Sequence, residues 1–314
     1  MRWLVLAASG LAAIVACGDD SKVECRVGAD CASGICTTDG TCAAAATSSS
    51  SGGPTTDASS NGNSDSDSGT MLSGDGSVAQ GCVPNKDGVI TREEVPLKAG
   101  LKATFRVATD VDVSTAGTTR NDGSREWDYS GAFTGDQNVT VETLSLNGTW
   151  YAPKYNGAAY SSKLRSDSNL FGVFDLAPAT IALRGVVTPD DDGVYRTELK
   201  YDPTVAVVTF PLKADATWTS ESDVSGVASG VPVAYTEKYE SQVDAHGDLK
   251  TPFATFPVLR VRTVLTRTVG FAVTTVRTFA FVTECYGTVA TVTSDDNEGD
   301  VEFTHALEIR RIAP

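Results

Sequence analysis

The carboxyl-terminal part of this 314-residue chain alternates apolar and polar side chains with a period of two. Residues 256–268 place Leu259 and Val261 on one face and Arg260 on the other. Successive side chains of a β-strand point to opposite faces, so this pattern predicts a strand with one buried face. The same reasoning predicts strands, separated by turn residues such as Gly270, over 101–108, 139–146, 195–201, 205–210, 232–242, 273–286, 289–293 and 301–312.

Such a series of strands predicts an all-β, antiparallel domain. No long stretch shows helical periodicity, and a sheet with one buried face either curls up or packs on a second sheet. We therefore expect an antiparallel β-barrel, half-barrel or sandwich over residues 82–314. In its last strand, Leu307 and Ile309 lie on the apolar face, whereas Glu308 and Arg310 lie on the opposite, polar face.

The amino terminus has the pattern of an export signal. Arg2 supplies a positive charge, and the run from Trp3 to Val15 contains no charged residue. That run is shorter than the roughly 20 residues that a membrane-spanning helix needs, and its length is typical of a signal peptide.

The last four residues of this segment, Ile14-Val15-Ala16-Cys17, resemble a bacterial lipobox. The resemblance implies a signal peptide over residues 1–16, cleavage before Cys17, and acyl chains on that cysteine. It also implies a location in the cell envelope and a partner in the membrane, reached through the lipid anchor. Gly18 is not the aspartate that retains lipoproteins at the inner membrane, which favours the outer membrane.

Six further cysteines form an even set, which in an exported chain predicts disulfides. Cys25, Cys31, Cys36 and Cys42 lie close together and allow three connectivities, among which spacing does not choose. Their spacings differ from the Cys-x-x-Cys pairs of zinc sites, so no metal is expected. The remaining two, Cys82 and Cys285, are predicted to bond to each other.

The four-cysteine segment also resembles the short Asp-Cys-x-Ser-Gly-x-Cys modules of myxobacterial surface lipoproteins. The resemblance covers about twenty residues and implies a surface context without a known activity; the matching residues are Asp30, Cys31, Ser33, Gly34, Cys36, Asp39, Gly40 and Cys42. A lipidated, cysteine-rich box is therefore expected over residues 17–42. Residues 43–81 have no aromatic residue, Lys or Arg, and this composition predicts a disordered linker.

Charge and motifs narrow the function classes. The formal net charge of −15 opposes binding to nucleic acid. His246 is expected in a solvated turn and His305 in the protein interior. Residues 85–94 resemble part of an EF-hand loop, but Val83 stands where its first ligand should be, so a β-turn is the favoured interpretation. No catalytic residue, metal or cofactor is predicted.

The leading functional hypothesis is a non-catalytic surface lipoprotein, with a β domain that acts as a binding or structural module on a flexible stalk. A curled sheet would offer its interior to an apolar ligand, while a protein or glycan partner stays open. The alternative hypothesis is a hydrolase of envelope or other polymers that uses a pair of carboxylates.

Overall fold

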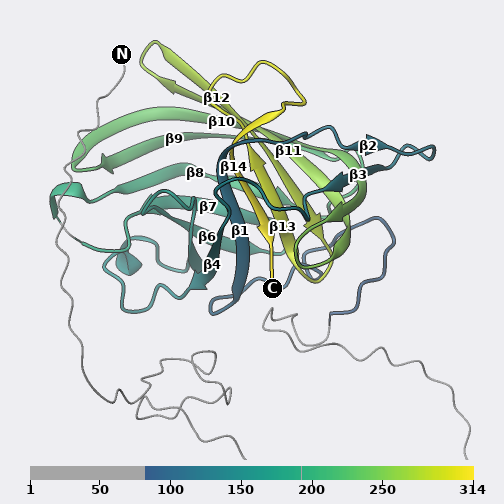
Figure 1. Cartoon of the computed structure of the whole chain (residues 1–314). Coiled ribbons are helices and arrows are strands. Elements are labelled where there is room, and N and C mark those ends of the chain that lie inside the picture. Colours follow the sequence, from purple (N-terminus) through teal and green to yellow (C-terminus); the bar gives the residue numbers. More distant parts are fainter. Residues whose placement is uncertain (1–81, 192) are drawn as a thin grey trace, which may run out of the picture. The chain divides into compact units, whose positions relative to one another are not determined.

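The computed structural model describes residues 82–314 except residue 192 (Figure 1). The predicted signal peptide, lipidation site, four-cysteine box and linker lie outside these residues. The described part is nearly all β, in agreement with the sequence. Its strands are β1 (Lys102–Asp112), β2 (Thr118–Thr119), β3 (Arg125–Asp128), β4 (Gln137–Leu144), β5 (Tyr160–Lys163), β6 (Phe171–Ala177), β7 (Thr180–Val187), β8 (Glu198–Thr209), β9 (Thr217–Ala228), β10 (Val231–Lys250), β11 (Thr255–Val269), β12 (Ala272–Thr283), β13 (Gly287–Thr293) and β14 (His305–Ile312).

The sheet closes into an antiparallel barrel. Its fourteen strands follow the order β11-β12-β13-β14-β1-β4-β5-β6-β7-β8-β9-β10-β3-β2, and β10 also pairs with β11. Without β2 and β3, which branch off β10, twelve strands complete the ring. The predicted strands 195–201 and 205–210 belong to one continuous strand, β8. Two 3₁₀ turns, Ala152–Lys154 and Gly193–Tyr195, complete the regular elements.

β10 is long enough to bond to two different partners along one edge. Its first half pairs with β9, from Val231 to Gln242, and its last four residues, Gly247–Lys250, pair in parallel with β3. The change of partner carries β2 and β3 to the outside of the ring, next to β11 (Figure 1).

The excursion that holds β2 and β3 covers the outer face of the barrel wall. Trp127 and Tyr129 pack edge-on against Phe281 of β12, with ring centroids 5.0 and 5.7 Å apart. The next side chain, Val282, points to the opposite face and lines the barrel interior. Both faces of this wall are therefore buried, so Arg260 on β11 is 1% exposed rather than solvated.

A second stretch covers the outside of β5 to β7. Tyr151 and Tyr155, from the connection between β4 and β5, pack with Leu146, Val173 and Val187. The Tyr151 hydroxyl lies 2.9 Å from the hydroxyl of Ser161. Because Ser161 points outward, its neighbours Tyr160 and Ser162 are left to point into the barrel, where they line a cavity.

Candidate functional site

The end of the barrel at which β1 begins is closed by residues 82–97, which we call the strap. Ile90 exchanges two backbone hydrogen bonds of 2.8 Å with Leu212. Ile90 and Val95 are buried among side chains from opposite strands, including Ile181 and Val261. The strap therefore packs into the end of the barrel, with side chains buried in its core.

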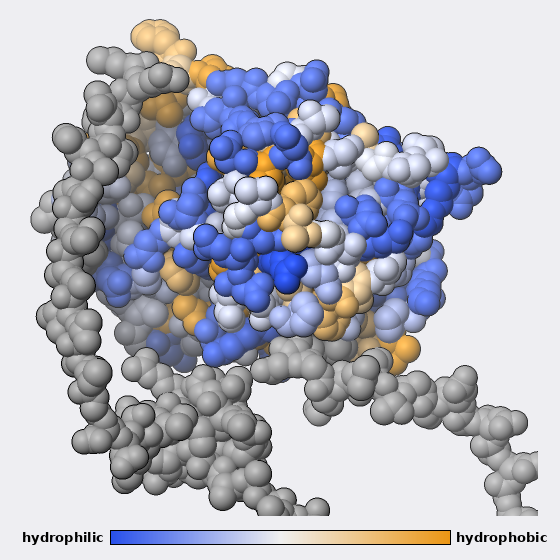
Figure 2. Space-filling view, viewed as in Figure 1, coloured by the Kyte–Doolittle hydropathy of each residue, from blue (hydrophilic) through white to orange (hydrophobic). Residues whose placement is uncertain are grey.

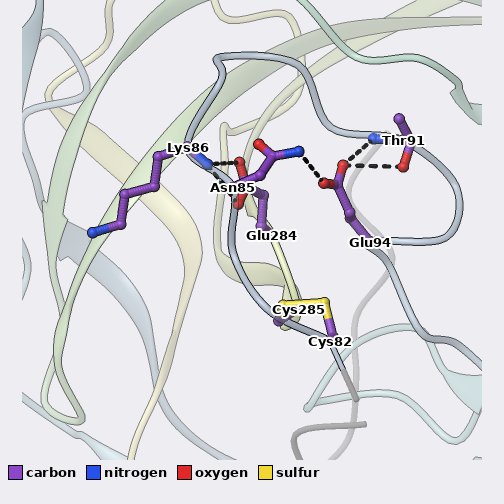
Figure 3. The surroundings of a disulfide bond; sticks show 7 residues. All are labelled: Cys82, Asn85, Lys86, Thr91, Glu94, Glu284 and Cys285. Carbon is purple, nitrogen blue, oxygen red and sulfur yellow. Dashed lines mark hydrogen bonds between the residues drawn. A yellow bond between two sulfur atoms is a disulfide. The ribbon is translucent and has the colours of Figure 1, made fainter. Parts of the chain in front are cut away.

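One disulfide fixes the strap to the barrel. The structure contains the predicted bond between Cys82 and Cys285, with the two Cα atoms 5.5 Å apart. Beside it, both carboxylate oxygens of Glu284 accept from the backbone N–H of Lys86, at 3.0 and 3.1 Å (Figure 3). The amide N–H of Cys285 donates to the carbonyl of Glu94 at 2.7 Å.

Residues 85–94, which resemble part of an EF-hand loop, are a turn with its own hydrogen bonds. The Glu94 carboxylate accepts from Asn85 Nδ2 at 2.8 Å and from the Thr91 N–H at 2.8 Å (Figure 3). Within the described residues, no group of three or more His, Cys, Asp or Glu side chains is placed to hold a metal ion.

Behind the strap lies a cavity of about 370 Å³ inside the barrel. This volume falls in the range of about 300–1,000 Å³ that is typical of small-molecule sites. Most of the lining is apolar and comes from the strap and from the side of the ring that runs from β12 through β1 to β8, for example Phe105, Val141, Phe174, Ile181, Phe210 and Val282. The hydroxyls of Tyr160, Ser162 and Tyr286 add polar groups to the wall.

The charged side chains at the cavity are all cationic. Lys102, Lys163 and Arg310 line it, and among the described residues that line it there is no Asp or Glu. Two of these cations are already paired with carboxylates, Lys102 with Glu142 at 3.2 Å and Arg310 with Glu308 at 2.6 Å. The lining is therefore mostly apolar, and the positive charge around it is largely neutralised.

The roof of the cavity is a polar layer across the barrel. Arg310 Nε donates to Glu308 Oε1 at 2.6 Å, and Arg310 Nη2 donates to the carbonyl of Leu164. The N–H and hydroxyl of Ser166 both donate to Glu308 Oε2. These bonds hold the loop between β5 and β6 inside the ring, and a smaller cavity of about 220 Å³, lined by Thr109, Gln137 and Ser166, lies next to it.

The sequence placed Glu308 and Arg310 on a solvated polar face, and that expectation is wrong. Glu308 is 4% exposed and both side chains point into the barrel, whereas Ile309 points outward into the core around Trp127. The excursion of β2 and β3 supplies apolar partners outside the wall, so the apolar face of β14 is the outer one.

A second buried ionic group lies between β10 and β11. Glu237 is fully buried on β10, accepts from the Tyr239 hydroxyl, and accepts from Arg267 Nε at 2.7 Å. Burial raises the pKa of Tyr239 well above its ordinary value, which keeps the phenol a hydrogen-bond donor. Neither Glu237 nor Tyr239 lines either cavity, so this group holds the wall together.

Both histidines lie in surroundings that differ from the predicted ones. His305 is 40% exposed and not interior; its ring nitrogens lie 3.1 Å from Asp112 Oδ1 and 3.0 Å from Asp110 Oδ1. His246 is exposed, as expected, but lies within β10 and not in a turn. Neither histidine lines a cavity.

Comparison with protein-family models, with curated proteins and with solved structures finds no match to this chain. Within residues 82–314, no helix is long and apolar enough to cross a membrane.

Proposed function

We propose that this protein is a non-catalytic binding module that holds an apolar ligand inside its β-barrel. The observation that carries the proposal is the cavity of about 370 Å³, walled by apolar side chains and closed at one end by the disulfide-bonded strap. Binding of an apolar molecule in a small, mostly apolar cavity is favourable, because the molecule displaces water that forms few hydrogen bonds there.

The amino-terminal segment supports a place for this module on a membrane. Lipid on Cys17 would tether the chain to the cell envelope, and the resemblance to a lipobox together with Gly18 favours the outer membrane. Residues 43–81 would then serve as a stalk between the anchor and the barrel. Mass spectrometry of the amino-terminal peptide from native protein tests the anchor, with acyl chains on Cys17 as the expected result.

The hydrolase alternative gains no support from the cavity. A pair of carboxylates facing a bound polymer would have to line an open cleft. Among the described residues, the two buried carboxylates nearest the interior, Glu308 and Glu237, each accept hydrogen bonds from an arginine and a hydroxyl.

Native mass spectrometry of protein purified from its own cells tests the binding function. We expect a species heavier than the polypeptide by one small apolar molecule, which organic solvent extracts. In Ala103→Trp an indole is placed in the cavity, and the ligand-bound fraction should fall at least fivefold. Ala234→Trp, at an exposed position on β10, is the matched control and should keep the ligand.

A further inference from the structure

The end of the barrel opposite the strap exposes a group of apolar side chains. Phe271, in the turn between β11 and β12, is fully exposed, and Val269 and Val273 on either side of it are 50% and 57% exposed. Val231, the first residue of β10, is 61% exposed. We call these four side chains the apolar tip. Exposed apolar residues that gather in one place, unlike scattered ones, mark a site of interaction.

Strand register brings the four residues to the same end of the sheet. β10 and β11 run antiparallel, and their ladder ends at Thr236 and Thr268, so β10 begins where β11 ends. Val269 pairs with Ala272, which closes the β11–β12 hairpin directly beyond this point. The end of that hairpin projects from the ring at the upper left of Figure 1, and hydrophobic atoms gather there in Figure 2.

The ends of both hairpins are uncharged. Residues 268–276, around the turn between β11 and β12, contain no Asp, Glu, Lys or Arg. The same is true of residues 224–236, around the turn between β9 and β10. In a chain with a net charge of −15, the apolar tip is therefore a projection without charge of its own.

Acidic segments border the apolar tip on both sides. In the acidic loop after β13, the Asn297 N–H donates to the Thr275 carbonyl at 2.7 Å. In the turn before β10, the Gly230 N–H donates to the Arg196 carbonyl at 3.0 Å, in a connection that has aspartates at 190–191. These neighbours would be repelled by a negatively charged surface, so the apolar tip matches a neutral one.

The predicted linker is long enough to bring the apolar tip to the membrane that would hold Cys17. The twelve residues of β12 run from the tip toward the disulfide, a span of roughly 40 Å. A flexible chain over residues 43–81 would have a mean span of about 30–37 Å and a far greater extended length. The tip would then reach the bilayer although the chain enters the domain at its other end.

We infer that the apolar tip inserts into the head-group region of a neutral lipid bilayer. The Phe271 ring and the three valines would leave water for the boundary between head groups and acyl chains, as the apolar faces of surface-bound helices do. This contact does not depend on what the cavity binds. It would orient on the membrane a domain that lipid on Cys17 only tethers.

Flotation with phosphatidylcholine vesicles tests the contact. The protein used is the full mature chain with Cys17→Ser, so that acyl chains contribute nothing to binding. Phe271→Asp should lower the partition coefficient by at least about tenfold, the scale expected when one apolar ring is no longer buried. Val83→Asp, at an exposed apolar position next to the disulfide, is the matched control and should leave binding unchanged. Equal partition of Phe271→Asp and its parent, or no binding by the parent, would overturn the inference.

A tryptophan at the turn shows whether this end enters the bilayer. Phe271→Trp keeps an apolar ring, so we expect binding to be retained and the new fluorescence to be quenched by brominated phosphatidylcholine. Val83→Trp, at the other end of the barrel, should give fluorescence that the bromine atoms do not quench. Binding that requires anionic lipid would contradict the inference. Self-association that Phe271→Asp abolishes, without binding to vesicles, would instead make a second copy of the chain the partner.

Discussion

Cys82 and Cys285 are bonded across 203 residues of sequence, so one disulfide connects the start of the strap to the turn after β12. This bond joins the plug of the barrel to its wall. Cys285 itself lines the cavity. The strap therefore has both a covalent connection to the barrel and a packed one.

We expect the double variant Cys82→Ser/Cys285→Ser to lose stability. A bond that closes so long a loop contributes at most about 5 kcal/mol in the chain-entropy model, and removal of native disulfides typically costs about 2–5 kcal/mol. Urea unfolding followed by tryptophan fluorescence measures the loss. Unchanged unfolding midpoints in the double variant would mean that packing alone holds the strap.

Arg260 is predicted to be one of the charged residues whose substitution lowers the stability of the fold most. It donates to Asp244 and Glu302 and to the Thr115 carbonyl, and its guanidinium group lies 4.2 Å from the ring centroid of Phe279. Arg260→Ala leaves the Asp244 carboxylate without its hydrogen-bond donor, although Trp127 still donates to the Thr115 carbonyl and Arg125 to Glu302. Because a buried ion pair is broken, we expect a cost of about 3–5 kcal/mol in the free energy of unfolding.

Arg165→Ala is the matched control for Arg260→Ala. Arg165 pairs with Asp167 on the surface, where the two side chains are 40% and 50% exposed. Such pairs contribute at most about 1 kcal/mol. Similar losses in the two variants would contradict the view that Arg260 joins the excursion of β2 and β3 to the barrel wall.

His305 should titrate above its ordinary pKa of 6.5, because hydrogen bonds with Asp112 and then Asp110 raise the pKa. The folded-state pKa is the higher one, so the charged ring stabilises the fold below the unfolded pKa. That contribution is lost as the pH rises through the folded pKa. NMR titration measures the shift, and Asp112→Asn should lower the pKa; the same pKa in both proteins would contradict the assignment.

Gly247 lies where β10 changes its partner to β3. Its φ is +155°, and a Cβ atom there would lie 1.8 Å from the carbonyl oxygen of Arg125. We expect Gly247→Ala to cost more than about 1 kcal/mol, since the two backbones have to separate. Gly299→Ala, with nothing within 4 Å of the added atom, should be close to neutral in the same unfolding assay.

Strand pattern and turn residues were enough to predict an all-β, antiparallel fold. The turn at Gly270 and the strands on either side of it lie where alternation placed them. Alternation states which residues share a face, but it does not state which face points inward. On β14 both faces are covered, so the inward direction of Glu308 and Arg310 depends on an excursion some 180 residues earlier in the chain.

The polar layer above the cavity had no local signal for the same reason. The strand β5 is four residues long and was not among the predicted strands, and Arg310 looked like a surface residue. Only the closed ring brings Arg310 to the loop after β5, where its Nη2 donates to the carbonyl of Leu164. The partner of Cys285, by contrast, was predictable because an even number of cysteines left one other candidate in the domain.

The closure of the ring also affects association between copies of this domain. A sheet with free edge strands exposes rows of unbonded amides and carbonyls, which can pair with strands of other molecules and start aggregation. Here the outermost strand of the described sheet is β2, which is two residues long. Crowded copies therefore have little exposed backbone through which one molecule's sheet could continue into the next.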